Sequence, residues 1–148
     1  MAETKNGDSL ESRGIFMFTG DVDDDLCSDA IEFIMKENFS GKNDKITMIV
    51  NSHGGSMTSG FSVIDVMKGS KIPVRTIGLG ILASMGLHIF ISGKKGERVL
   101  TPNTLIMSHQ WTWGTYGKEH ELLASMKSFD LVTEMQIRHY RKIGRAHV

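Results

Sequence analysis

Short apolar strands alternate with amphipathic helical patterns along most of this chain, and this alternation limits the folds that it can adopt. Three apolar runs have the length of buried strands: 14–19, 45–50 and 74–79. Helical patterns follow them, at 26–34 after the first run, at 57–67 after the second and from Ser84 onward after the third. Because strands that alternate with helices at this spacing pair in parallel through right-handed crossovers, the pattern predicts an α/β fold.

Turn residues and periodicity predict the remaining elements. Gly20 is expected to close the first strand, and the acidic cluster 21–25 is expected to cap the next helix, which fits these carboxylates better than a metal site. Two short strands, 98–100 and 104–107, are expected around a turn. The pattern over 118–143 predicts one long amphipathic helix, which we expect to project and meet another subunit.

Composition narrows the class of protein. The 148 residues suit one domain, with a flexible segment at 1–13 and the folded domain at 14–142. The formal net charge is zero and no basic stripe occurs, so nucleic acid is not an expected partner. Cys27 is the single cysteine, and no apolar run is long enough to span a bilayer, so we expect a cytoplasmic protein without membrane contact.

The corner Ala83-Ser84-Met85-Gly86 stands between the third apolar run and a helical pattern. A strand–turn–helix of this kind lifts a serine hydroxyl out of the backbone, and the start of the helix directs free N–H groups toward it. Ser84 is therefore a candidate nucleophile. A serine here is also a common helix N-cap, and Leu82 stands where the G-x-S-x-G motif has its first glycine.

Two further stretches are candidate partners of this serine. Gly54-Gly55 follows a buried strand, where exposed backbone N–H groups suit an oxyanion or a phosphate, although a tight turn explains the pair equally well. His109 follows another apolar strand and is a candidate general base, with a structural histidine as the alternative.

The other histidines are weaker candidates. His88 is expected to pack in the helix after the corner, and His53 adjoins the glycine pair, where it contacts either substrate or the turn itself. The remaining three are expected at exposed positions: His120, His139 and His147. No H-E-x-x-H motif or Cys/His cluster occurs in the sequence, which argues against a metalloenzyme.

Three separated motifs resemble the proteolytic subunit of the Clp protease: Asn51-Ser52-His53-Gly54-Gly55-Ser56, Gly80-Ile81-Leu82-Ala83-Ser84-Met85-Gly86, and Pro102-Asn103 with Met107-Ser108-His109-Gln110. The similarity runs over about 13–142. It implies that Ser84 is the nucleophile and His109 the general base. It also implies that the N–H groups of Gly55 and Met85 form the oxyanion hole, where two donors stabilise the charge that develops on the carbonyl oxygen.

The same resemblance implies a Clp/crotonase-like α/β spiral of ββα units, whose long helix is the handle that joins two rings. The rings are expected to have seven members, with an ATP-driven AAA+ unfoldase as partner and no cofactor or metal in this chain. A peptide or unfolded protein is the expected substrate, held as an extended strand by strand addition. The residues expected to contact it are Gly54, Ser56, Met57, Gln110, Trp111 and Thr112.

The chain also departs from the family pattern. The aspartate that orients the histidine in the family follows the long helix, so we expect it beyond Val148 and expect this chain to be weakly active at best. His53 and Trp111 stand where the family tends to have proline, which predicts a different peptide preference. The N-terminal segment is shorter than the family's, which affects the surface that docks the ATPase. Residues 143–148 match an in-frame translation of a common sequencing adapter and are interpreted as a non-native tail, with a natural polar tail as the alternative.

Two other functions stay open from the residues alone. A non-catalytic ring subunit would use the same fold without a working serine, and an acyl-CoA enzyme of the crotonase fold would use the same pair of backbone donors. Absence of fluorophosphonate labelling at Ser84 would favour the first, and binding of CoA would favour the second. A self-cleaving or capsid-maturation protease of similar fold is a close relative of the main hypothesis.

Overall fold

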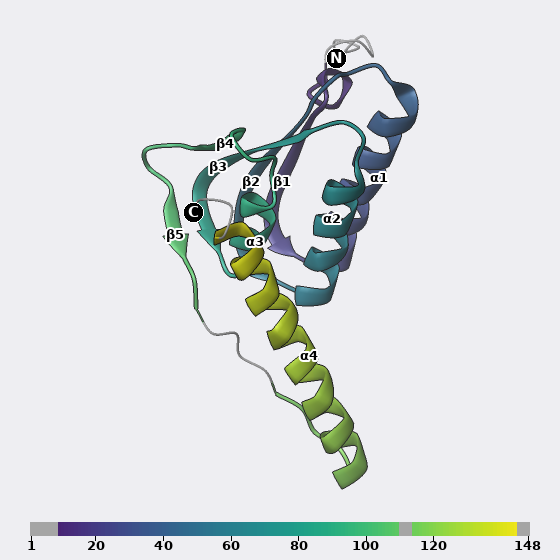
Figure 1. Cartoon of the computed structure of the whole chain (residues 1–148), viewed down its shortest axis with the longest axis vertical. Helices are drawn as coiled ribbons and strands as arrows, with labels where there is room; N and C mark the ends of the chain where they lie inside the picture. The colour runs from purple at the N-terminus through teal and green to yellow at the C-terminus, as the bar shows by residue number, and fades with distance from the viewer. Residues whose placement is uncertain (1–8, 110–113, 145–148) are drawn as a thin grey trace, which may run out of the picture. The chain divides into compact units, whose positions relative to one another are not determined.

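The computed structural model describes residues 9–109 and 114–144 of this chain. The chain divides into two compact units, 1–108 and 109–148, and each is described by itself (Figure 1). Most of the predicted flexible segment and of the predicted non-native tail lie outside the described residues, so both interpretations stay predictions, as do the domain limits 14–142. Within the N-terminal segment, however, Glu11–Arg13 forms a short 3₁₀ helix rather than an unstructured stretch.

The first unit alternates strands with helices. After the 3₁₀ helix, its elements in chain order are β1 (Ile15–Val22), α1 (Asp24–Ser40), β2 (Ile46–Gly55), α2 (Met57–Gly69), β3 (Val74–Ala83), α3 (Met85–Ile91), β4 (Arg98–Leu100) and β5 (Leu105–Met107). The second unit contains one long helix, α4 (Glu119–Gly144). This is the α/β class predicted from the alternation of apolar runs and helical patterns.

The strands form one five-stranded sheet in which every pair is parallel. The order is β1-β2-β3-β4, and β5 also pairs with β3. Strand β4 pairs with the first part of β3, from Thr76 to Gly78, whereas β5 pairs with its last part, from Ile81 to Ala83. The two short strands were expected around a turn, and each in fact uses β3 as its partner, so that β5 ends beside the end of β3.

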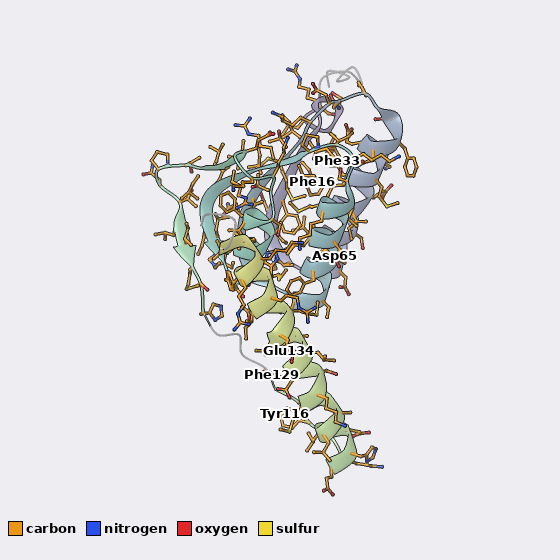
Figure 2. The ribbon with its side chains drawn as sticks, in the orientation of Figure 1. Phe16, Phe33, Asp65, Tyr116, Phe129 and Glu134 are labelled. Atoms are coloured by element: carbon orange, nitrogen blue, oxygen red, sulfur yellow. The ribbon has the colours of Figure 1, made fainter. Side chains whose placement is uncertain are left out.

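One face of the sheet is buried under helices. Every second residue of β2 points into this face, from Ile46 through Met48 and Val50 to Ser52. Helix α1 packs on β1, where the ring centroids of Phe16 and Phe33 lie 5.3 Å apart (Figure 2), and α3 packs on β2 and β3. The period-2 alternation of a strand therefore places the core on this side.

Strands β1, β2 and β3 are longer than their apolar runs. Strand β1 continues through Gly20 to Val22, although Gly20 was predicted to end it, because Asp21 pairs with Gly54 and Val22 pairs with Gly55 of β2. Parallel pairing supplies backbone hydrogen bonds to polar residues that have no apolar signal. The extension carries the glycine pair to the carboxyl edge of the sheet.

The acidic cluster caps α1, as predicted. The side chain of Asp23 accepts a hydrogen bond from the N–H of Leu26 at 2.8 Å, and Asp24 and Asp25 occupy the first helical turn. Carboxylates there satisfy free N–H groups and complement the helix dipole. The helix ends at Gly41, whose backbone is left-handed with φ 60°.

Helix α4 confirms the prediction of one long helix and runs for 26 residues. Large apolar side chains on it are exposed: Leu123, Met126, Leu131, Met135 and Ile137. His139, which was expected to be exposed, is buried with a relative exposure of 4%, since it falls on the less exposed stripe that includes Phe129, Val132 and Gln136. Among the described residues, no helix is both long and apolar enough to cross a membrane.

Candidate active site

Ser84 occupies the junction between the last residue of β3 and the first residue of α3. Its backbone has φ 50° and ψ −123°, and it is the one non-glycine residue with a positive φ among those that the structure describes. A backbone in such a sparsely populated region costs an L-residue on the order of 1–3 kcal/mol. Its side chain makes no capping hydrogen bond to α3, so the N-cap alternative does not explain this serine. Strain of this kind, held in place by the surrounding structure, is typical of functional positions.

Backbone hydrogen bonds hold this corner from both sides. The N–H of Ser84 donates to the carbonyl of Met107, the last residue of β5, at 3.0 Å. The carbonyl of Ser84 accepts from the N–H groups of Leu87 at 3.1 Å and His88 at 3.3 Å in α3. The corner is therefore fixed to a neighbouring strand as well as to its own helix.

The glycine pair approaches the corner closely. Gly54 has φ 101°, and a Cβ at this position would lie 2.7 Å from Cβ of Ser84, 2.9 Å from the carbonyl oxygen of Ala83 and 3.0 Å from the backbone N of Met85. A Cβ at Gly55, which has φ 149°, would collide with the carbonyl of Val22. The structure thus brings together Gly54, Ser84 and the amide of Met85, and both glycines are needed for space as well as for conformation.

Met85 presents its backbone, not its side chain, to this corner. Its side chain is fully buried and lies against Gly60 of α2, where a Cβ would be 2.7 Å from Cε and 3.1 Å from Sδ of the methionine. The glycine in α2 leaves room for the methionine, and the buried side chain fixes the first turn of α3. The amide of Met85 consequently has a defined position beside the serine.

Three of the predicted substrate-contacting residues can be placed: Gly54 belongs to the glycine pair, and Ser56 and Met57 lie just after it. Ser56 caps α2 by accepting a hydrogen bond from the N–H of Ser59, and its own N–H donates to the carbonyl of Val22 at 2.6 Å. Met57 is buried as the first residue of α2. The other three, Gln110, Trp111 and Thr112, lie outside the described residues.

His109 is exposed and is the first residue of the second unit. Its convergence with Ser84 therefore stays a prediction. His88 packs as predicted: it is buried in α3, with its ring centroid 6.2 Å from that of Phe61. His53 is exposed within β2, beside the glycine pair.

Cys27 is a poor competing nucleophile. It is buried in α1, and burial, reinforced by the negative charges of Asp23 and Asp24, raises the pKa of its thiol to about 11. The thiol therefore stays protonated at neutral pH, and the thiolate is the reactive form. Within 9–109 and 114–144, no group of three or more His, Cys, Asp or Glu side chains is arranged to hold a metal ion.

A family model described as Clp protease matches residues 3–145, which is nearly the whole chain. The chain belongs to the Clp protease family. The strained serine between β3 and α3 and the glycine pair beside it are thus features of a member of this family, and the resemblance inferred from the three motifs is confirmed.

Curated relatives carry the same family name. The chain is 33% identical over 120 residues to ATP-dependent Clp protease proteolytic subunit 2 of Nocardia farcinica, which covers 81% of this chain and 59% of the relative. It is 37% identical over 103 residues to the ATP-dependent Clp protease proteolytic subunit of Leuconostoc citreum, covering 70% of this chain and 52% of the relative. It is also 37% identical over 108 residues to the chloroplastic subunit 3 of Arabidopsis thaliana, covering 72% and 35%. The matched part of this Clp protease chain spans about half of the length of the two bacterial relatives.

Ser52 and Asn51 contribute to the geometry of this Clp protease site, although sequence reasoning gave them no role. The Oγ atom of Ser52 accepts a hydrogen bond from the N–H of Gly54 at 3.0 Å, and Oδ1 of Asn51 accepts one from the N–H of Ile81 at 3.1 Å. The alternation of β2, continued by two residues, would have placed Ser52 on the buried face. Nothing in the sequence indicates which amides the two side chains bind.

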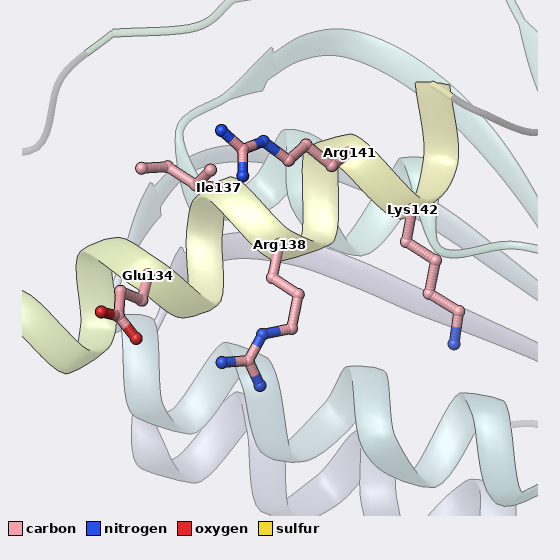
Figure 3. Close-up of a pocket in the computed structure, with 5 residues that line it drawn as sticks. All are labelled: Glu134, Ile137, Arg138, Arg141 and Lys142. Atoms are coloured by element: carbon pink, nitrogen blue, oxygen red, sulfur yellow. The ribbon is translucent and has the colours of Figure 1, made fainter.

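A separate hollow in the Clp protease chain lies along α4 (Figure 3). It is lined by Glu134, Ile137, Arg138, Arg141 and Lys142. The side chains of Glu134, Arg138 and Lys142 project to one side of the helix and that of Arg141 to another. None of these residues belongs to the predicted site.

Proposed function

We propose that this chain is a serine endopeptidase subunit of the ATP-dependent Clp type, which hydrolyses peptide bonds of unfolded polypeptides inside a ring chamber. The observation that carries the proposal is the backbone of Ser84, held at φ 50° between a strand and a helix with Gly54 packed against it. Membership of the Clp protease family supports the same activity.

The proposed reaction proceeds through an acyl-enzyme. Oγ of Ser84 attacks the carbonyl carbon of the scissile bond while an imidazole nitrogen of His109 takes the hydroxyl proton. The C–N bond of the tetrahedral intermediate then breaks, the amine leaves with the proton from His109, and an ester remains on Ser84. Water adds to the ester, its proton passes to His109 and then to Oγ, and the carboxyl product leaves.

The N–H groups of Gly55 and Met85 are the proposed donors to the oxyanion. The closeness of Gly54 to the Met85 amide and to Ser84 supports this role, because it brings the glycine turn and the start of α3 to the same side of the serine. Loss of one such donor in other enzymes costs roughly 3–4 kcal/mol of transition-state stabilisation. Met85 donates through its backbone, so its buried side chain is free to anchor the helix.

The position of β5, the strand just before His109, supports the role of this histidine as general base. The Ser84 N–H donates to the carbonyl of Met107, two residues before His109 in the sequence.

Substrate is proposed to bind as an extended strand beside the main chain that follows Gly55 and His109. Strands β2 and β5 both end at the carboxyl edge of the parallel sheet, where β3 leads into Ser84, so the main chain that follows each of them starts from the same edge as the proposed nucleophile. Gly54, Ser56, Met57, Gln110, Trp111 and Thr112 are the proposed contacts.

Assembly into stacked rings and docking of an AAA+ unfoldase complete the proposal. The exposed apolar side chains of α4, among them Met126 and Leu131, support self-association because such surface is normally covered. ATP is proposed to be used by the unfoldase, and this chain needs no cofactor for chemistry by a serine and a histidine. A cytoplasmic location is part of the proposal, since a single, buried cysteine suits a reducing compartment.

Covalent labelling tests the proposal directly. A fluorophosphonate probe is incubated with this chain, and the modified peptide is identified by mass spectrometry. We expect modification at Ser84 and loss of labelling in Ser84→Ala. Ser92→Ala, which removes a hydroxyl at the other end of α3, is the matched control and should keep the label.

The labelling experiment also separates the enzyme from the ring scaffold. If the chain assembles into rings but takes no label at Ser84, the peptidase proposal fails and a non-catalytic ring subunit is favoured instead. A label that survives Ser84→Ala would place the reactive group elsewhere. His109→Ala should slow labelling by at least about 100-fold if this histidine is the base.

A further inference from the structure

The end of β2 carries a buried hydroxyl that the proposed chemistry does not use. Ser52 has a relative exposure of 1%, and it follows the apolar side chains of Ile46, Met48 and Val50 on the inward face of this strand, just before the glycine turn. Its Oγ accepts a hydrogen bond from the N–H of Gly54 at 3.0 Å. A buried N–H that loses its acceptor costs about 1–3 kcal/mol, so this bond fixes the path of the turn.

Ser52 also contacts the first turn of α3. A Cβ at Gly86 would lie 2.8 Å from Cβ and 2.8 Å from the carbonyl oxygen of Ser52, and 3.2 Å from its Oγ. Helix α3 therefore packs directly against Ser52 at Gly86, the residue after Met85. Any change in the size or position of the Ser52 side chain is transmitted to the start of the helix, since packed interiors have little free volume.

We infer that Ser52 is a positioning residue that sets the separation of the two proposed oxyanion donors. It holds the turn that presents the Gly55 amide through a hydrogen bond to Gly54, and it supports the helix that presents the Met85 amide through Gly86. The inference rests on the proposed function, because the separation matters for a tetrahedral oxyanion.

The neighbouring residue Asn51 keeps Ser52 in this place. Between Val50 and Ser52, the register with β3 shifts from Gly78 to Leu82, so β3 bulges at this point. The side chain of Asn51 fills the bulge by accepting from the N–H of Ile81 at 3.1 Å. Because successive side chains of a strand point to opposite faces, Asn51 secures β3 while Ser52 faces the turn.

The test compares Ser52→Ala with Thr76→Val, which removes another fully buried hydroxyl that bonds the carbonyl of Phe90 at 2.8 Å. Amide hydrogen exchange is measured by mass spectrometry over 53–56 and 84–87, and fluorophosphonate labelling of Ser84 is measured as kinact and KI. We expect Ser52→Ala to speed exchange at 53–56 about 10-fold or more. We expect kinact to fall about 10- to 100-fold with KI within about 2-fold, as for a misplaced catalytic group.

Thr76→Val should lose stability without either change, since it lies outside both donor segments. Equal loss of kinact in the two variants, or unchanged exchange at 53–56 in Ser52→Ala, would overturn the inference. If Ser52→Ala does not fold, Ser52→Cys carries the same test, because its sulfur is a weaker acceptor of similar shape. If the unchanged chain takes no label, the proposed function fails, and the exchange measurement alone then decides whether Ser52 fixes the turn.

Discussion

Two turns that flank β2 both depend on glycine, and they depend on it for different reasons. Gly41 ends α1 with φ 60°, and a Cβ there would meet no atom within 4 Å. Gly54 has φ 101°, and a Cβ there would lie 2.7 Å from Cβ of Ser84. The first turn needs a left-handed backbone, whereas the second needs that backbone and the absence of a side chain. Close approach, more than backbone conformation, distinguishes the candidate site from an ordinary helix end.

Two glycines inside helices also differ in whether a side chain would meet a neighbouring atom. Gly86 in α3 is in contact with Ser52, while Gly69 at the end of α2 has open space where its Cβ would be. Neither has a positive φ, so conformation plays no part in this pair. Alanine substitutions at the four positions, ranked from the largest expected effect to the smallest, test whether proximity to the candidate site decides the cost.

Gly54→Ala is expected to have the largest effect. The added methyl would overlap Cβ of Ser84 and the carbonyl of Ala83, and alanine also disfavours a positive φ. Overpacking and backbone strain together should lower the free energy of unfolding by about 3 kcal/mol, measured by urea denaturation. If Gly54→Ala lowers the free energy of unfolding by less than Gly41→Ala does, close approach is not what makes glycine necessary at this site.

Gly86→Ala is expected to cost about 2 kcal/mol. The methyl would meet the Cβ and the backbone oxygen of Ser52, each at 2.8 Å, and part of this cost is offset because alanine favours a helix more than glycine does. Urea denaturation measures the loss. A stabilising result would mean that α3 moves away from Ser52 at little cost, which would also weaken the positioning role of that serine.

Gly41→Ala is expected to cost about 1 kcal/mol, from the left-handed backbone alone. No neighbouring atom has to move, so fluorophosphonate labelling of Ser84 should be unchanged. The pair of measurements, unfolding and labelling, separates a conformational effect from an effect on the site. Slower labelling would show that this turn is coupled to the opposite end of β2.

Gly69→Ala should have the smallest effect and the opposite sign. The position has room for a methyl and a backbone that alanine adopts, so we expect stabilisation by about 0.5 kcal/mol. A small rise in the urea midpoint at constant slope would confirm it. Destabilisation would mean that the end of α2 is more restricted than its open surroundings indicate.

The helices of this protein could be predicted from sequence because their signals are local. Asp23 caps α1 within three residues of its own position, and the apolar spacing of α4 repeats along a single element. Strand ends were less predictable, since β1 runs through Gly20 only because β2 supplies partners for the residues beyond it. For the same reason the sequence did not indicate that β4 and β5 pair with β3, because this partner strand is remote from them in the chain.

The candidate site divides in a similar way. Glycines and a serine at strand ends indicated Gly54 and Ser84, and the structure brings them together. The pairing of Ser84 and His109 remains a prediction carried by the motifs. Ser52 was overlooked because a serine next to a turn has many ordinary uses, and its burial becomes visible only when α3 covers it.

By itself, the sequence determined the α/β class, the order of most elements and the family, because periodicity, helix caps and spaced motifs are written in neighbouring residues. Tertiary structure alone decided how far the strands extend, which side chain holds the glycine turn and why Gly54 tolerates no side chain. These features depend on atoms that are distant in the chain and close in space. The local sequence does not specify these distances, which arise only when the sheet is assembled.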